Sequence, residues 1–220
     1  MGITKEMVSP LFDAVMTRSP DGVWQARNLV AGEWIDPAGG HFSVTSPVDG
    51  HIVARFPKAS REEVLQAIAA AEAAKPLIRD IAAIDRISLF ERVHVLLEEN
   101  EPLFRELLLM EAGKPAHEAK GEIAATKERL KMIMQEVKRI TGEYIPGDWS
   151  HDTSGKIALV VHEPVGVVAA VTSFNYPLYI PAAKIIPALL AGNSVVVKPA
   201  SAVPLTLLCF VRLLEEAGFP

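Results

Sequence analysis

Residues 165–220, VGVVAAVTSFNYPLYIPAAKIIPALLAGNSVVVKPASAVPLTLLCFVRLLEEAGFP, decide the fold class of this chain. Two continuous apolar runs, 167–171 and 194–197, are each followed by a loop and a helical segment. The second helix, 204–217, ends at Gly218. Apolar strands that alternate with helices are typical of a parallel sheet covered on both faces. The stretch therefore predicts an α/β fold.

The same region is long and apolar enough to cross a bilayer, because residues 165–197 contain one charged side chain, Lys184. Pro177, Pro181 and Pro187 would interrupt the helix that such a span requires. We therefore interpret the apolarity as that of buried strands and helices, and expect no membrane partner.

The preceding segment shows short strand patterns followed by a helix. Residues 30–35 predict one short strand, and residues 42–55 predict a hairpin about a Pro-Val-Asp-Gly turn. Ser60 and Glu63 form a capping-box pattern, so a helix begins there and is expected to end or kink at Pro76. Its apolar stripe comprises Val64, Leu65, Ile68, Ala69 and Ala71.

Three more helices are predicted. One covers about 82–99, the next is capped by Asn100 and ends at Gly113, and the third covers 116–141 and ends at Gly142. Charges of both signs alternate on the outer face of the third helix, which we interpret as a solvated wall. Residues 144–154 are then rich in turn formers and 157–162 are apolar, which predicts a hairpin arm.

Composition limits the cellular setting and the partners. The chain has 220 residues with 22 basic and 27 acidic side chains, and its formal charge of −5 argues against nucleic acid as a partner. A single cysteine, Cys209, excludes an internal disulfide framework and favours a cytoplasmic location. The first 20 residues lack the unbroken apolar stretch of a signal peptide and are interpreted as a flexible or loosely docked extension.

Polar side chains gather where the two predicted strands end. Residues 172–177 follow the first strand and residues 198–201 follow the second. Ligands of parallel sheets bind beyond the carboxyl ends of the strands, where helix N-termini offer free backbone donors. From the residues alone, a nucleotide site and a set of helix caps beside a solvated lysine remain alternatives.

Six strings resemble, in order, the aldehyde dehydrogenase family. They are the run from Leu29 (LVAGEWIDPAGG…SPVDGHIVARFP), EAGKP from Glu111, EPVGVV from Glu163, FNYPL from Phe174, PALLAGNSVVVKPAS from Pro187 and EAGFP from Glu216. The resemblance covers the chain after residue 28 and implies the N-terminal part of that fold, a Rossmann-like parallel sheet with helices and a β-hairpin oligomerisation arm.

The resemblance also implies a division of the chain. Residues 1–28 are an N-terminal extension, and 29–143 form the first part of the cofactor-binding domain. The oligomerisation arm is 144–164, and 165–220 are an incomplete Rossmann-like cofactor-binding segment. The family's catalytic domain, with its cysteine and general-base glutamate, is implied to lie beyond this chain.

Two residues match catalytic positions of the family. Asn175 matches the asparagine whose side-chain amide helps stabilise the oxyanion that forms when a thiolate attacks an aldehyde. Lys184 resembles a lysine that is sometimes given an acid–base role. The alternatives are that Asn175 organises the start of the following helix and that Lys184 is a buried structural hydrogen-bond donor.

The resemblance predicts NAD or NADP as cofactor. Lys198 resembles the lysine that holds the adenosine ribose hydroxyls, and Ser201 stands where members specific for NAD often place a glutamate. A serine does not repel a 2′-phosphate, so we expect tolerance of NADP, with a simple loop or capping role as the alternative. The rest of the predicted cofactor path is Val171, Thr172, Ser173, Phe174, Asn175 and Ala200.

The substrate prediction rests on Arg139 and Tyr176. Both resemble residues that contact substrate in members acting on small anionic aldehydes, such as non-phosphorylating glyceraldehyde-3-phosphate dehydrogenase. An arginine suits a phosphate or carboxylate, although Arg139 lies in a charge-rich helix where an ordinary surface arginine is the alternative.

Neither a second nucleophile nor a metal site is expected. Cys209 lies between Leu208 and Phe210 on an amphipathic helix, where a lone cysteine is a small buried hydrophobe. The six histidines show no metal-binding spacing.

Together these features predict NAD(P)-dependent oxidation of an aldehyde to a carboxylic acid through a cysteine thioester. The thiol belongs to residues beyond this chain, so we expect the 220 residues alone to be inactive. The intact enzyme is expected to be a homo-dimer or homo-tetramer. The alternative is a truncated, non-catalytic module that binds a nucleotide or a partner.

Overall fold

A parallel pair of strands organises the C-terminal part of the chain. In the computed structural model, which describes residues 3–4, 7–36 and 39–220, β9 (Val167–Val171) pairs with β10 (Ser194–Lys198). Helix α5 (Tyr179–Leu190) connects the two strands, and α6 (Leu205–Ala217) follows β10. The predicted order of strands and helices is therefore confirmed.

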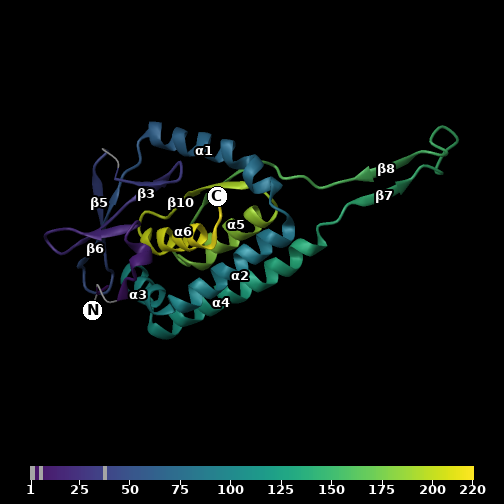
Figure 1. Cartoon of the computed structure of the whole chain (residues 1–220). Helices are drawn as coiled ribbons and strands as arrows, with labels where there is room; N and C mark the ends of the chain where they lie inside the picture. The colour runs from purple at the N-terminus through teal and green to yellow at the C-terminus, as the bar shows by residue number, and fades with distance from the viewer. Residues whose placement is uncertain (1–2, 5–6, 37–38) are drawn as a thin grey trace.

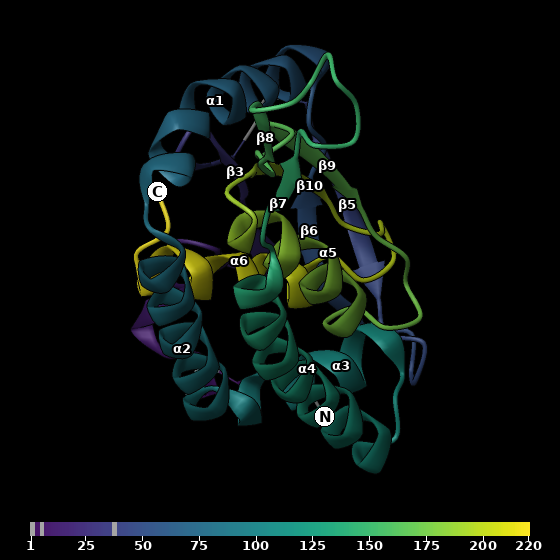
Figure 2. The same ribbon diagram turned by 90° about the vertical axis from the view of Figure 1, so that its right-hand side faces the viewer.

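This sheet is covered less completely than predicted. Helices α1 (Arg61–Asp80) and α5 pack against β9 and β10 (Figure 2). Ala170 is buried, but Ala169 is exposed and Val171 is 56% exposed. The prediction of strands buried on both faces is wrong here, because alternate side chains of β9, those of Ala169 and Val171, point to one face and are exposed there.

Three helices build the wall below α5 and α6. They are α2 (Ala83–Glu99), α3 (Glu101–Ala112) and α4 (Ala116–Glu136). Helix α4 packs along α5 and α2 packs along α6, as Figures 1 and 2 show. The apolar faces of these helices meet in one core, in which Phe90, Phe104, Leu130, Leu178 and Phe210 are fully buried.

The segment before residue 29 belongs to the folded body. Strands β1 (Met16–Arg18) and β2 (Trp24–Ala26) join β6 (Ile52–Pro57) and β5 (His41–Thr45) in a sheet of order β1-β2-β6-β5. The short helix η2 (Pro10–Phe12) precedes them. The interpretation of the first 20 residues as a flexible or loosely docked extension is wrong for those that the structure describes, because their apolar side chains complete the core: Phe12, Val15 and Met16 are buried.

Two hairpins follow in the N-terminal part. The predicted hairpin of 42–55 is confirmed by the antiparallel pairing of β5 with β6. The single strand predicted at 30–35 is instead a hairpin of β3 (Asn28–Val30) and β4 (Glu33–Ile35). Ala31 and Gly32 lie between them with φ of 53° and 82°, and two successive left-handed residues make the tight turn.

Helix α1 keeps its predicted start, and of the two outcomes predicted at Pro76, an end or a kink, the end is wrong. Ser60 Oγ accepts from the Glu63 amide at 3.2 Å and Glu63 Oε2 accepts from the Ser60 amide at 2.6 Å, which confirms the capping box. The helix continues through Pro76 to Asp80. Of its apolar stripe only Ala71 is buried, so this face contributes little to the core.

The ends of α3 and α4 also differ from the sequence prediction. Asn100 does not cap α3, because its Nδ2 donates to the carbonyl of Leu96 at 2.8 Å. Gly113 ends α3 with φ of 64°, as predicted. Helix α4 ends at Glu136 rather than Thr141, and a 3-10 turn, η3 (Val137–Arg139), leads out of it.

The predicted arm is a hairpin that projects far from the body (Figure 1). It pairs β7 (Glu143–Pro146) with β8 (Ile157–Val160). Gly142 lies at the base of the arm, where its two strands come together. A Cβ there would lie 2.1 Å from the Val160 carbonyl oxygen, so the position requires glycine. Large apolar side chains of the arm are exposed, among them Tyr144, Trp149, Ile157, Leu159 and Val161.

Within the described ranges, no helix combines the length and the apolarity needed to cross a membrane.

Candidate functional site

The two predicted loops meet at the carboxyl edge of the parallel sheet. Val171 lies opposite Lys198 at the ends of β9 and β10. The Thr172 amide donates to the Lys198 carbonyl at 3.1 Å, and Thr172 Oγ1 donates to the same oxygen at 3.3 Å. The structure thus joins the starts of the two loops through Val171, Thr172 and Lys198, and the other predicted cofactor residues follow along these loops: Ser173, Phe174, Asn175, Ala200 and Ser201.

A local hydrogen bond orients the side-chain amide of Asn175. Ser173 Oγ donates to Asn175 Oδ1 at 2.8 Å, and both residues are exposed. Because Oδ1 is engaged as an acceptor, the Nδ2 group is the part left to donate outward. A preorganised amide donor of this kind can stabilise negative charge that develops on a substrate oxygen.

Lys184 reaches from α5 back to the end of β9. Its Nζ donates to the Val171 carbonyl at 2.6 Å, and the side chain is exposed. The expectation of a buried lysine is therefore wrong, because Lys184 lies on the outward side of α5. Its observed contact is that of a donor that ties the helix to the strand end.

A buried glutamate caps the helix that follows the Asn175 loop. Glu122 Oε1, from α4, accepts from the amides of Leu178 and Tyr179 at 2.9 and 3.0 Å. These amides belong to the first turn of α5 and have no partner within that helix. Sequence reasoning missed Glu122. The available signal was its place between buried Ala119 and Thr126, on the inner face of a helix of which only the outer face was interpreted as solvated.

Two cations and two tyrosines surround this cap. Lys114 Nζ lies 2.8 Å from Glu122 Oε2 and 4.0 Å from the centre of the Tyr176 ring. The guanidinium of Arg129 lies 5.5 Å from the centre of the Tyr179 ring. The two rings meet edge to face with their centres 6.3 Å apart. Tyr176 thus joins a cationic cluster at the start of α5.

A second buried glutamate caps α6. Glu111, from α3, accepts from the Leu205 amide at 2.7 Å and from the Thr206 amide and hydroxyl at 2.8 Å. Burial raises the pKa of Glu111 from 4.5 to about 7, against the lowering effect of these hydrogen bonds. Its signal in the sequence was a carboxylate three and four positions after Leu108 and Leu107, on the apolar face of α3.

The two glutamates change the expected chemistry of the strand ends. The sequence predicted that helix N-termini would offer free backbone donors, but Glu122 holds those at the start of α5 and Glu111 those at the start of α6. That prediction is wrong, because carboxylates of this chain take the place that a phosphate would need. The loops themselves remain exposed and can contact a ligand.

The observed groups suit a nucleoside of NAD(P) better than its phosphates at a helix start. Lys198 is exposed and its Nζ donates to the adjacent Pro199 carbonyl at 2.9 Å. Ser201, three residues on, presents an exposed hydroxyl. An ammonium and a hydroxyl at one strand end can hydrogen-bond ribose hydroxyls, and Ser201 adds no negative charge against a 2′-phosphate.

Arg86 acts at the opposite end of α5. Its Nε donates to the Leu190 carbonyl at 3.0 Å, and its Nη1 donates to carbonyls at the end of α1, those of Ile78, Arg79 and Ile81. Burial lowers the pKa of Arg86 from its ordinary value. A cation at one end and the Glu122 carboxylate at the other both complement the dipole of α5.

The structure does not bring Arg139 to Tyr176 within one chain. Arg139 is 77% exposed and pairs with Glu136 at 3.2 Å, beside the groove formed by Pro187 and Leu190 at the far end of α5. Tyr176 precedes α5, which spans about 18 Å. No contact within this chain therefore supports an anion site shared by Arg139 and Tyr176, because η3 and the Asn175 loop lie at opposite ends of one helix. The substrate role of the two residues stays a prediction.

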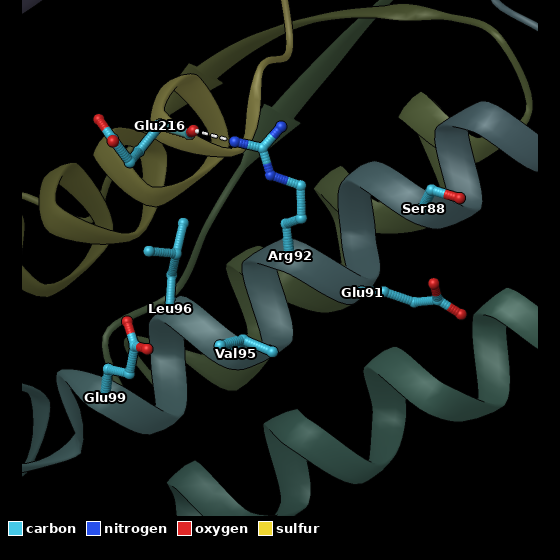
Figure 3. Close-up of a pocket in the computed structure, with 7 residues that line it drawn as sticks. All are labelled: Ser88, Glu91, Arg92, Val95, Leu96, Glu99 and Glu216. Carbon is cyan, nitrogen blue, oxygen red and sulfur yellow. Dashed lines mark hydrogen bonds between the residues drawn. The ribbon is translucent and has the colours of Figure 1, made fainter.

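Two other features are separate from this site. Cys209 is fully buried, and burial, with Glu111 nearby, raises the pKa of its thiol well above the ordinary value, which confirms the prediction of a buried hydrophobe. No three side chains of His, Cys, Asp or Glu cluster as a metal site in the described part of the chain. A groove on α2 ends at Glu216, whose carbonyl accepts from Arg92 Nη2 at 3.3 Å (Figure 3).

Comparison with known proteins agrees with this geometry. Residues 34–220 match the aldehyde dehydrogenase family. Over 199 residues the chain is 38% identical to glutarate-semialdehyde dehydrogenase of Pseudomonas putida, covering 90% of this chain and 41% of that protein. The chain belongs to the aldehyde dehydrogenase family, whose members are oxidoreductases that use NAD(P).

Solved structures show the same part of the fold. NADP-dependent glyceraldehyde-3-phosphate dehydrogenase from Bacillus halodurans, complexed with NADP, matches with a TM-score of 0.86 and 38% identity over 89% of this chain and 42% of that one. Aldehyde dehydrogenase 21 from Physcomitrella patens, in complex with the reaction product succinate, matches with a TM-score of 0.85 and 31% identity over 89% and 41%. The chain thus spans about two fifths of these relatives, and the predicted α/β fold class and family are confirmed.

Proposed function

We propose that this chain is the N-terminal, cofactor-binding part of an NAD(P)-dependent aldehyde dehydrogenase that oxidises an aldehyde to a carboxylic acid through a cysteine thioester. The observation that carries the proposal is the pairing of β9 and β10 at their carboxyl ends. Lys198 ends β10, and the loop that follows β9 carries Asn175, whose amide is oriented by Ser173. Residues 29–143 and 165–220 would form the cofactor-binding part and 144–164 the arm.

In this reaction the chain supplies binding and charge stabilisation. A thiolate from residues beyond this chain adds to the aldehyde carbon, and Asn175 Nδ2 donates to the oxygen that becomes negative. NAD(P), when bound, accepts the hydride. Lys198 and Ser201 would hold the ribose, and Lys184 would keep the end of β9 in register with α5 through the Val171 carbonyl.

The test uses the full-length polypeptide that carries the thiol. Asn175→Ala should lower turnover by roughly a hundredfold, the scale at which loss of one oxyanion donor acts. Asn100→Ala, which alters an amide at the α2–α3 junction, is the matched control and should leave turnover within about twofold. A near-normal rate for Asn175→Ala would return that residue to a structural role at the start of α5. Aldehyde oxidation by the 220 residues alone would refute the assignment of the thiol elsewhere.

We also propose NADP use and a small anionic substrate. Ser201, three residues after Lys198, carries no negative charge to repel a 2′-phosphate, and the Bacillus halodurans relative was solved with NADP. The names of the relatives contain glutarate semialdehyde, glyceraldehyde 3-phosphate and succinate, all anions. Arg129 lies over Tyr179, whose ring meets that of Tyr176 edge to face, and is a better placed cation for such a tail than Arg139.

The arm supports a proposal of self-association. Trp149 and Leu159 lie exposed on a hairpin that stands clear of the body (Figure 1), and exposed apolar area of this kind marks interaction surfaces. We propose a homo-dimer or homo-tetramer for the intact protein and a cytoplasmic location, the latter from its single buried cysteine.

A further inference from the structure

The loop that carries Asn175 is hydrogen-bonded at both of its ends to residues of other elements. At the first end, Thr172 is bound to the Lys198 carbonyl through its amide and its hydroxyl. At the second end, the Leu178 and Tyr179 amides are bound to Glu122. Of the residues between, 173–176 are exposed and Pro177 is buried. Their conformation therefore depends on how firmly the two ends are held.

Glu122 is the stronger of the two attachments. Its side chain is only 1% exposed, and it receives two amide hydrogen bonds and an ion pair from Lys114, itself 11% exposed. Hydrogen bonds to a charged acceptor are about twice as strong as neutral ones. The carboxylate also faces the positive end of the α5 dipole.

Lys114 gives Glu122 a second route to the same loop. The ammonium group that pairs with Glu122 also lies 4.0 Å from the centre of the Tyr176 ring. Tyr176 is adjacent to Asn175, and its carbonyl accepts from the Ile180 amide at 3.1 Å. One buried carboxylate thus restrains the backbone after Asn175 and, through Lys114, the side chain next to it.

We propose that Glu122 is the positioning residue of the Asn175 loop, acting through the Leu178 and Tyr179 amides and through Lys114. It touches neither substrate nor cofactor. The proposal rests on the proposed function only for the chemical use of Asn175; the restraint itself is a property of this chain and can be measured without catalysis.

The experiment is amide hydrogen exchange and NMR of the isotope-labelled 220-residue chain. In Glu122→Ala, exchange at Leu178 and Tyr179 should accelerate by roughly tenfold to a hundredfold, as expected for loss of a charged acceptor. The side-chain Nδ2 signals of Asn175 should shift and broaden. Glu122→Gln keeps an acceptor oxygen for the amides and should restore most of their protection.

Glu111→Ala is the matched control, because it removes the equivalent cap from α6. It should accelerate exchange at Leu205 and Thr206 and leave the Asn175 signals in place. Two results would overturn the proposal: unchanged Asn175 signals in Glu122→Ala, or an equal change in Glu111→Ala, which would indicate general destabilisation.

Lys114→Met keeps the proposal testable if Glu122→Ala does not fold. It removes the ammonium group but leaves Glu122 bound to the amides, so Asn175 signals should shift while Leu178 and Tyr179 stay protected. If the Asn175 signals keep their original positions in Lys114→Met, the second route is refuted. If Glu122→Ala is also unfolded, the same result refutes the whole proposal. Failure of the proposed function is a separate result, because it shows only in turnover of full-length Asn175→Ala.

Discussion

Glu111 makes the stability of this chain depend on pH in an unusual direction. Its pKa in the folded chain is about 7, roughly 2.5 above its ordinary value of 4.5, because burial disfavours the charged form. Each pKa unit corresponds to about 1.4 kcal/mol, so the difference amounts to about 3 kcal/mol. The folded chain binds this proton more tightly than the unfolded chain. The contribution of this proton to the free energy of unfolding is therefore fully present below about pH 4.5 and is lost as pH rises through about 7.

The assay is urea unfolding of the wild type and of Glu111→Gln at pH values from about 4.5 to about 8. Glutamine cannot titrate, so the other ionisable groups cancel when the two free energies of unfolding are subtracted. The change in hydrogen bonding to Leu205 and Thr206 adds a constant offset. We expect the wild type to lose about 3 kcal/mol relative to the variant across this range. A difference independent of pH, or one that favours the wild type as pH rises, would show that the hydrogen bonds outweigh burial and would refute the reasoning.

Three further predictions concern the cofactor, the substrate and the fold. In the full-length enzyme, Ser201→Glu should shift preference from NADP toward NAD, because a carboxylate repels the 2′-phosphate; the same ratio of kcat/KM for the two cofactors before and after would contradict this. Arg129→Leu should raise KM for anionic aldehydes and leave neutral ones unchanged, whereas Arg139→Leu, at the exposed end of η3, should alter neither; the opposite pattern in steady-state kinetics would restore the sequence-based assignment of Arg139. Arg86→Met should lower the free energy of unfolding by about 3 kcal/mol, since charged hydrogen bonds to the ends of α1 and α5 are lost, and a loss below about 1 kcal/mol in urea unfolding would argue that water replaces the guanidinium.

The order of strands and helices in residues 165–220 follows from the sequence alone. Periodicity, chain stiffness and glycine act over a few residues: Gly218 ends α6 with φ of 104°, and the capping box at Ser60 joins groups three positions apart. The same holds for the family resemblance, because its strings are contiguous. Local signals failed where a local rule was overridden, as at Pro76, which α1 passes through, and at residues 30–35, where Ala31 adopts a left-handed conformation.

Tertiary structure decided how the site is held, because the partners are distant in the chain. Glu122 is 56 residues from Leu178, Glu111 is 94 from Leu205 and Arg86 is 104 from Leu190. In the sequence each of these residues is one of several charged residues of its helix. A periodic pattern does not predict which residue a side chain contacts across the core. Only the packing of α3 and α4 against α5 and α6 turns two of these charges into helix caps. The same packing places Arg139 at the far end of α5 from Tyr176.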